Sequence, residues 1–381
     1  MLKLENCRDR QQRLLRLMQT ESLVLVVLTN PKSIYYFSGA LLDSSLPHAF
    51  VMKAGGPSLL ITNAPIGQPA EPPKSAADDA LIYEWHSIER DVSATTWHSD
   101  VAGLAKKTIL RMIPRGGSVG VEAEFLSAVV AEAVREGAGK SGTNITRALS
   151  DMRRQKDPDE IECIRRTVEL AETGFAALKS RLAPGMTEFK AYSIFYDAMV
   201  AKAETSVTLN GDFACGVRAI RGGGPPTNRR LQFGDLYILD IYPSYQGYMC
   251  DFTRTFVIGG PSQLQQDAWG HVMEAHAIAH RMIHPGVPTR DVYDALKRHL
   301  DKFKPAEGSF WHHAGHGVGM NGWELPWLTP GSEDVIRDRE VLACEPGLYD
   351  KALQGGIRLE HNYLVTNEGV TTLDHFPMEL F

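Results

Sequence analysis

Two acidic residues lie inside apolar, strand-like segments of the chain. Asp240 is part of the segment LYILDIY, and Asp251 is part of YMCDFTRTFV. Apolar strands seldom bury an unpaired carboxylate, because removing the charge from water is costly. Residues 243–247 look like a turn, so we expect a hairpin that makes the two acids cross-strand neighbours, with Cβ atoms roughly 4.5–5.5 Å apart. Carboxylates this close repel each other unless a proton or a cation lies between them.

A second pair of strand-like segments repeats this pattern. Glu345 lies in VLACEPGLY and Glu360 in GIRLEHNYLV, and the two acids are symmetric about a point near residues 352–353. Between the two predicted hairpins, His316 lies in the glycine-rich stretch HHAGHGVGMNGWELP. Each of these residues alone is more often a capped acid or a satisfied histidine, so the hypothesis depends on the joint pattern. Four carboxylates and one imidazole suit two divalent ions roughly 3.5–4 Å apart that share bridging carboxylates.

The elements that must position these side chains can be traced in the second part of the chain. Asp157, Pro158 and Glu160 form a strong helix start, with a capping box and proline at the first helical position. Pro184-Gly185 and Pro285-Gly286 each interrupt a helical pattern, and the two breaks are 101 residues apart. If this repeat is more than coincidence, it indicates two α/β halves related by a pseudo-two-fold axis, with a site between them.

The first part of the chain has a different organisation. Helical patterns alternate with short apolar runs, which is typical of an α/β layer. The predicted strands cover residues 23–29, 49–53, 58–62, 82–85 and 118–122. A charged segment near residues 150–160 makes a plausible boundary, which predicts an N-terminal domain over 1–151 and a catalytic domain over 152–381.

Composition excludes several classes of protein. The 381 residues carry a formal net charge of −6, which gives no basic face for nucleic acid. No apolar run approaches the length of a membrane span, and the N-terminus has no signal-peptide pattern. The five cysteines are odd in number and widely spaced, which fits reduced thiols better than a disulfide framework. We therefore expect a cytoplasmic protein that binds neither nucleic acid nor membrane.

Four short motifs resemble those of the M24 metallopeptidase family, which includes aminopeptidase P, prolidase and creatinase-like proteins. The motifs are D-x10-D (Asp240, Asp251), G-H-G-x-G (residues 315–319), E-P-G-x-Y (345–349) and I-R-x-E (357–360). The resemblance implies an α+β chain whose C-terminal domain has the pseudo-symmetric pita-bread fold. The segment NPKSIYYFSGA resembles the creatinase/prolidase type of N-terminal α/β domain. The similarity thus covers nearly the whole chain.

The resemblance also implies roles for individual residues. Metal would be bound by Asp240, Asp251, His316, Glu345 and Glu360, with Asp251 and Glu360 bridging. Glu345 would also transfer a proton, and His312 would help to stabilise the developing oxyanion. Arg358 would brace the site and contact substrate, whereas we expect His313 to be a bystander. The implied cofactors are two divalent ions (Mn, Co, Fe or Zn), and the implied reaction is attack of a metal-bridging hydroxide on an Xaa-Pro amide bond of a short peptide, in a homodimer.

Two positions depart from the family pattern. Peptidases of this family carry a histidine seven residues after the ligand histidine and another about 17 residues before the first ligand aspartate; here these positions are Trp323 and Gly223. In the family both imidazoles contact the substrate, so we expect Trp323 to line the pocket. The departures leave open a non-peptidase relative, namely a small-molecule amidohydrolase of the ectoine hydrolase type or a lyase of the dimethylsulfoniopropionate lyase type. A non-catalytic binding relative is the third alternative, although it would be expected to have lost ligands.

Overall fold

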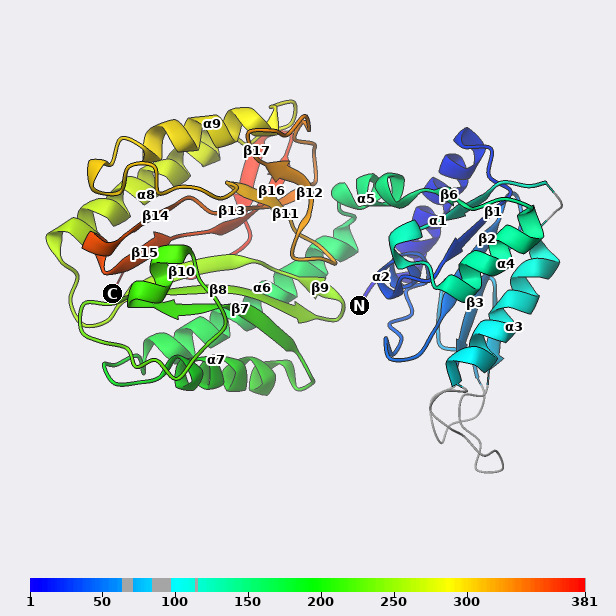
Figure 1. The fold of residues 1–381 in the computed structure, drawn as a ribbon, viewed down its shortest axis with the longest axis horizontal. Helices are drawn as coiled ribbons and strands as arrows, with labels where there is room; N and C mark the ends of the chain where they lie inside the picture. Colours follow the sequence, from blue (N-terminus) through cyan, green and yellow to red (C-terminus); the bar gives the residue numbers. More distant parts are fainter. Residues whose placement is uncertain (64–70, 84–96, 114–115, 381) are drawn as a thin grey trace. The chain divides into compact units, whose positions relative to one another are not determined.

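A computed structural model of the chain describes residues 1–63, 71–83, 97–113 and 116–380. The chain divides into two compact units, Met1–Met152 and Arg153–Phe381. Figure 1 labels most of the helices and strands of both units. The mixture of helices and sheets confirms the α+β class expected from the sequence.

The N-terminal unit is built on one mixed sheet. Its strands are β1 (Leu25–Leu28), β2 (Ala49–Lys53), β3 (Ser58–Asn63), β4 (Asp79–Tyr83), β5 (Val119–Val121) and β6 (Thr143–Asn144), in the order β4-β3-β2-β1-β5-β6. The predicted hairpin of β2 and β3 is confirmed by their antiparallel pairing. The strand predicted over 82–85 begins three residues earlier, and its last two residues lie outside the described ranges.

The helices of this first part of the chain follow the predicted alternation with strands. They are α1 (Leu4–Thr20), α2 (Pro31–Ser38), α3 (Trp97–Met112), α4 (Ala128–Ala138) and α5 (Thr146–Arg154). Buried residues of β1, β2 and β5 form a hydrophobic core with residues of α3 and α4, such as Ile109 and Val134. Burial of these apolar side chains explains why the strands read as short apolar runs in the sequence.

The C-terminal unit contains three antiparallel sheets. The first consists of β7 (Thr208–Cys215), β8 (Leu236–Tyr245) and β10 (Phe252–Val257), with β9 (Tyr248–Met249) paired to β8. The second has the order β12-β11-β13-β16-β17, from β11 (Gly315–Gly317), β12 (Glu324–Leu328), β13 (Val341–Cys344), β16 (His361–Thr366) and β17 (Gly369–Thr372). The third pairs β14 (Gly347–Asp350) with β15 (Gly355–Arg358).

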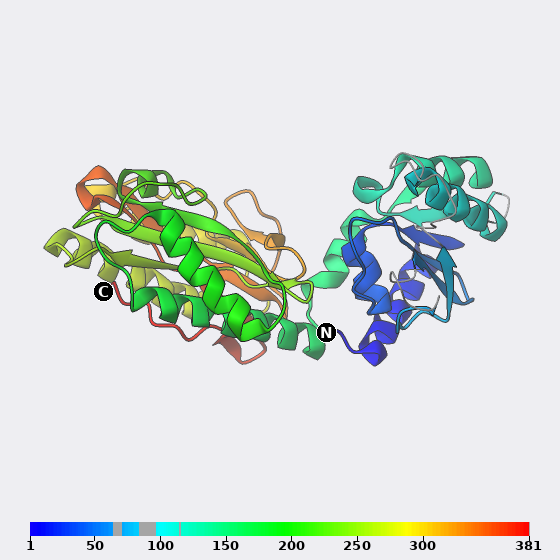
Figure 2. The ribbon, with the colours of Figure 1, turned by 90° about the horizontal axis from the view of Figure 1, so that it is seen from below.

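Two pairs of helices cover these sheets. The pairs are α6 (Pro158–Lys179) with α7 (Glu188–Ala203), and α8 (Gln263–Met282) with α9 (Thr289–Leu300). The first pair contacts β7 and β8, and the second contacts β12, β15 and β17. Figures 1 and 2 show the sheets of this unit between the two pairs. Within the described ranges, no helix combines the length and apolarity needed to cross a membrane.

The two halves of the C-terminal unit repeat the same local structure. The capping box of Asp157 and Glu160 starts α6, as predicted. Gly185 (φ 85°) and Gly286 (φ 92°) follow the first helix of each pair in left-handed conformations that favour glycine. The Gly185 N–H donates to the Leu231 carbonyl at 2.8 Å, and the Gly286 N–H donates to the Ile336 carbonyl at 2.9 Å. The repeat read from the sequence is therefore present in the structure.

Candidate metal centre

The first hairpin carries Asp240 and Asp251, but its register differs from the prediction. Asp240 pairs with Thr253 across the sheet, so Asp251 lies two residues along the partner strand, just before β10. The turn consists only of Gln246 (φ 49°) and Gly247 (φ 79°), because pairing of β8 with β9 continues up to Tyr245. The expectation that Asp240 and Asp251 face each other directly is thus wrong, and they are diagonal neighbours instead.

The second hairpin places Glu345 opposite Glu360, as the symmetry of the sequence predicted. Cys344 pairs with His361 on one side of these acids, and Gly347 pairs with Arg358 on the other. Both pairs belong to the same register, so the two glutamates face each other where the strands are interrupted. The Glu360 N–H donates to the Thr253 carbonyl at 3.2 Å, which connects this hairpin to β10 of the first sheet.

His316 lies on β11, between β12 and β13. Its flanking glycines permit this close packing, because a Cβ on Gly315 would lie 2.0 Å from the Ala343 carbonyl oxygen and one on Gly317 would lie 2.2 Å from that of Leu325. The His316 Nδ1 donates to the Gly317 carbonyl at 3.1 Å, which leaves Nε2 with its lone pair. This Nε2 lies 3.5 Å from Oε1 of Glu345 and 3.7 Å from Oδ2 of Asp251.

The buried carboxylates of this cluster are electrostatically unsatisfied. Burial, together with the neighbouring carboxylates, raises the pKa of Asp251 and of Glu360 well above the usual range. Burial also raises the pKa of Asp240 to about 6, although the Arg358 charge opposes this. Oδ1 of Asp240 and Oδ1 of Asp251 are buried without a hydrogen-bond partner among the described residues. Unpartnered carboxylate oxygens in a cluster where a neutral imidazole nitrogen lies 3.7 Å from Oδ2 of Asp251 fit the donor set of a divalent cation.

Glu345 differs from the other three acids because histidines surround it. Burial raises its pKa, but contact with His313 and the electrostatic interactions with His313, His312 and His316 outweigh burial and lower it to about 2. His313 Nδ1 lies 3.0 Å from Glu345 Oε1, whereas His312 Nδ1 lies 3.8 Å from Oε2. The expectation that His313 is a bystander is therefore wrong. Its adjacency to His312 was the only signal in the sequence.

His312 is held by hydrogen bonds at both ring nitrogens. Nδ1 donates to the His313 carbonyl at 2.7 Å, so Nε2 accepts from the Tyr349 hydroxyl at 2.8 Å. Burial lowers the pKa of His312 to about 4, which keeps the ring neutral near pH 7. Because Nε2 carries no proton in this tautomer, the neutral ring accepts from Tyr349 and has no Nε2 proton to donate to a substrate oxygen.

Arg358 faces two carboxylates. Its Nη2 donates to Oδ2 of Asp240 at 2.7 Å and to Oδ2 of Asp212 at 2.9 Å. Asp212 lies on β7 directly across from Asp240. The sequence reasoning missed Asp212, although the signal used for Asp240, an acid inside a strand, is also present in TLNGDFAC.

A buried arginine braces the peptide segment that carries Glu360. Arg254 is fully buried and donates from Nη1 to the Glu360 carbonyl at 2.7 Å and from Nη2 to Asp374 Oδ1 at 2.6 Å. Thr253 Oγ1 donates to Oε2 of Glu360 at 2.7 Å. Asn362 Nδ2 donates to the Asp251 carbonyl at 2.7 Å. These contacts orient two of the acids from behind.

Trp323 lies at an open edge of the cluster. Its side chain is 56% exposed, and its ring centroid is 6.5 Å from that of His316 and 5.5 Å from that of Tyr242. Its contact with a substrate stays a prediction.

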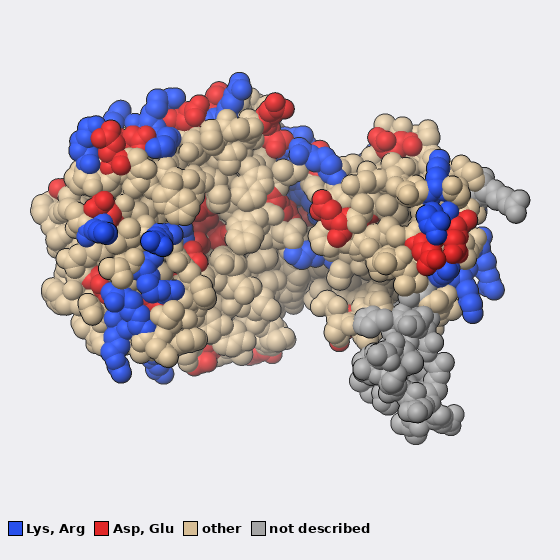
Figure 3. Space-filling model, viewed as in Figure 1, with Lys and Arg blue, Asp and Glu red and all other residues tan. Residues whose placement is uncertain are grey.

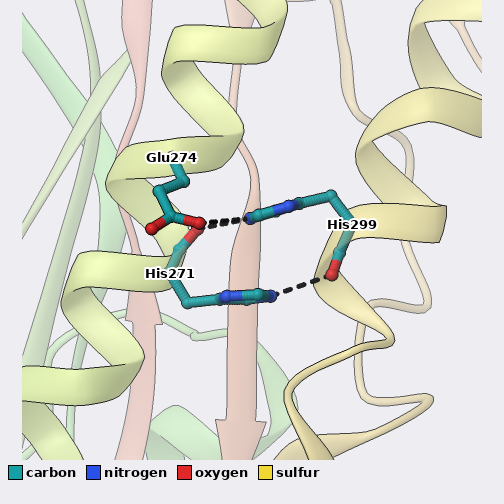
Figure 4. A group of neighbouring side chains, drawn as sticks. All are labelled: His271, Glu274 and His299. Atoms are coloured by element: carbon teal, nitrogen blue, oxygen red, sulfur yellow. Dashed lines mark hydrogen bonds and ion pairs between the residues drawn. The ribbon is translucent and has the colours of Figure 1, made fainter.

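A separate group of His271, Glu274 and His299 lies between α8 and α9 (Figure 4). The two imidazoles stack with centroids 4.0 Å apart and planes at 14°. Each Nε2 donates to the other residue's backbone carbonyl, at 2.8 and 3.0 Å. Lone pairs of nearly parallel rings do not converge on one ion, so the geometry does not favour a metal site. The reciprocal hydrogen bonds instead link α8 to α9.

Comparison with known proteins identifies the family. The model of metallopeptidase family M24 matches residues 162–367, and the model of the creatinase/prolidase N-terminal domain matches residues 10–155. The Xaa-Pro dipeptidase of Pyrococcus furiosus is 26% identical over 382 residues, which cover 98% of this chain and 99% of that protein.

Solved structures share the fold over nearly the full length. A prolidase from Pyrococcus horikoshii OT3 has a TM-score of 0.80 at 22% identity, covering 98% of this chain and 100% of that one. An Xaa-Pro dipeptidase from Bacillus anthracis has a TM-score of 0.83 at 21% identity, covering 98% and 99%. The chain therefore belongs to metallopeptidase family M24 and is a metal-dependent hydrolase with a creatinase-type N-terminal domain and a pita-bread C-terminal domain.

Proposed function

We propose that the C-terminal unit hydrolyses an amide bond of a short peptide, of the Xaa-Pro type, with divalent ions held by Asp240, Asp251, His316, Glu345 and Glu360. One observation carries the proposal: buried Oδ1 atoms of Asp240 and Asp251 without hydrogen-bond partners lie in the cluster that contains the neutral Nε2 of His316. The dipeptidase from Pyrococcus furiosus, which aligns over the whole chain, supports the substrate class.

The residues around the cluster have separate tasks in this proposal. Bound divalent ions supply a water that is acidic near neutral pH and an electrophile for the carbonyl oxygen. Glu345 stays ionised, because its pKa is lowered to about 2, and it accepts a proton at a carboxylate oxygen. His313 Nδ1 lies 3.0 Å from Oε1 of this carboxylate. His312 orients the Tyr349 hydroxyl through its Nε2, and only a ring protonated at Nε2 could donate to the oxyanion.

Further features of the proposal come from the family resemblance. We infer two ions per chain, chosen from Mn, Co, Fe and Zn, because four carboxylates and one imidazole suit a shared pair of ions. A homodimer and a cytoplasmic location belong to the same proposal. All five cysteines are buried free thiols, which agrees with a reducing compartment.

Metal analysis and a substrate panel test the proposal together. Protein loaded with Mn²⁺ or Co²⁺ should retain about two ions per chain after desalting, and Asp251→Asn should retain fewer. The loaded protein should cleave Gly-Pro, Ala-Pro or the tripeptide Ala-Pro-Ala, measured by release of the free amino acid. A protein that binds no metal would contradict the metal centre. A metal-loaded protein that cleaves none of the three would contradict the peptidase assignment.

Two positions favour a second candidate, a non-peptidase hydrolase or lyase of the same fold. Trp323 and Gly223 replace the histidines expected from the resemblance, and Trp323 lies at an open edge of the cluster. Turnover of a small non-peptide amide without turnover of Xaa-Pro peptides would support this candidate. The non-catalytic alternative is not favoured, because all five expected ligand residues are present.

A further inference from the structure

The carboxylate of Asp212 occupies the space that a side chain at position 223 would need. A Cβ on Gly223 would lie 2.0 Å from Oδ2 of Asp212 and 2.5 Å from its Cβ. Gly223 and Gly224 have φ angles of 158° and 138°, so the second at least adopts a conformation that favours glycine. Any larger residue at 223 would displace the acid. The chain thus presents a carboxylate where the resemblance led us to expect an imidazole.

The nearest cation is already engaged. Nη2 of Arg358 contacts both Asp212 and Asp240, and only 6% of this arginine is exposed. The Asp212 side chain, in contrast, is 26% exposed. A molecule that enters beside β7 therefore meets Asp212 before it meets the guanidinium.

Tyr242 is a diagonal neighbour of Asp212 across β7 and β8, and the Trp323 ring packs against Tyr242. Tyr242 is two residues beyond Asp240 on β8, so its side chain projects from the same face of the sheet as those of Asp240 and the paired Asp212. The Tyr242 and Trp323 rings are 5.5 Å apart at an interplanar angle of 50°. Burial, together with the nearby Asp212, Asp240 and Asp251, raises the pKa of Tyr242 to about 12.

We propose that Asp212, Tyr242 and Trp323 form a subsite for a positively charged group of the substrate, specifically an alkylated ammonium. Cations lie favourably over the faces of tryptophan and tyrosine, and a weakly hydrated ammonium gains most from them. Asp212 adds a negative charge, but its Oδ2 is already used by Arg358, so the aromatic faces supply most of the contact. This inference rests on the proposed function, because it describes the substrate of the same site.

The charges around the centre agree with this preference. Two divalent ions would balance the four ligand carboxylates, and Asp212 balances Arg358. The Arg358 guanidinium is therefore already compensated where a substrate would meet Asp212. Figure 3 shows both acidic and basic side chains at the surface of the C-terminal unit.

A matched pair of ligands tests the subsite without any turnover. Choline and 3,3-dimethylbutan-1-ol have nearly the same shape and differ by one positive charge. We expect calorimetric titration of the Mn²⁺-loaded protein to show at least tenfold tighter binding of choline. Asp212→Asn should reduce this ratio to threefold or less, and Asp212→Glu should retain it. Trp323→Leu should also reduce the ratio. Because this variant leaves the Asp212–Arg358 contact intact, it tests the subsite even if Asp212→Asn folds poorly.

The control variants are Asp267→Asn and Phe189→Leu, which change an exposed acid and an exposed aromatic residue outside the cluster. Both should keep the wild-type ratio. Equal binding of choline and the alcohol by the wild type, or an unchanged ratio in both Asp212→Asn and Trp323→Leu, would overturn the inference. Selective choline binding by a protein that cleaves no peptide would instead overturn the proposed function and leave the subsite standing.

Discussion

Removal of divalent ions should destabilise the protein, and the loss should increase with pH. In the metal-free protein, burial and mutual repulsion raise the pKa values of Asp251 and Glu360, so these acids retain protons at pH values at which exposed acids have lost them. Metal ions and protons therefore compete for the same carboxylate oxygens. At low pH the protons satisfy the buried acids, whereas at high pH only a cation can do so.

The size of the effect follows from the raised pKa values. For Asp240 the rise from 3.8 to about 6 corresponds to about 3 kcal/mol of preference for the protonated form. The folded metal-free protein binds more protons than the unfolded chain in this window, so the free energy of unfolding falls as pH rises from about 4 to above 6. Asp251 and Glu360 extend the loss to higher pH. The stabilisation by metal should thus grow by about 1.4 kcal/mol per pH unit for each proton that metal displaces.

Urea unfolding at pH 5.5, 6.5, 7.5 and 8.5, with Mn²⁺ and with chelator, measures this difference. Taking the difference at each pH cancels the groups that titrate identically in both forms. Asp251→Asn should reduce the slope and should stabilise the metal-free protein at pH 8.5 by at least about 1 kcal/mol. Asp267→Asn should leave the slope unchanged. A metal stabilisation that is constant or declines between pH 5.5 and 8.5 would refute the reasoning.

Three further predictions concern single residues. Trp323→His restores the imidazole expected from the resemblance and should raise kcat/KM for Ala-Pro at least tenfold; an unchanged value would show that this position does not limit peptide cleavage. Burial lowers the pKa of His276 to about 3, so the free energy of unfolding decreases as pH falls below about 6.5. His276→Gln should make this decrease between pH 7.5 and 5 smaller by about 2 kcal/mol, as measured by calorimetry. Gly315→Ala brings a Cβ to 2.0 Å from the Ala343 carbonyl oxygen and should lower the free energy of unfolding by about 2–4 kcal/mol in urea; a loss below 0.5 kcal/mol would contradict the close packing of β11.

The hairpins that carry the acids could be predicted from the sequence because carboxylates interrupt otherwise apolar strands. Symmetry located Glu345 opposite Glu360, since a single register continues on both sides of them. At the first hairpin the same argument placed the centre of the turn one residue too early. Pro243 suggested an early turn, but the chain reverses at Gln246 and Gly247, whose left-handed conformations form a two-residue turn.

The residues that were missed depend on contacts between distant elements. Asp212 faces Asp240 because β7 pairs with β8. The sequence reasoning predicted β8 but not β7. His313 lies in the irregular segment after Phe310, where no helical or strand periodicity in the sequence could indicate that its side chain approaches Glu345. Local patterns thus identified acids within a strand, but not the neighbours that a second strand or a loop supplies.

The division of the cluster between two repeated halves has a consequence for assembly. Asp240 and Asp251 come from the half that starts with α6, and the other three proposed ligands come from the half that starts with α8. Backbone bonds such as that from Glu360 to Thr253 join them at the centre. Neither half expressed alone would contain the full set of ligands for two metal ions. Metal uptake would therefore serve as a reporter for complementation between two fragments of the chain divided near Gly260, where α8 has not yet begun.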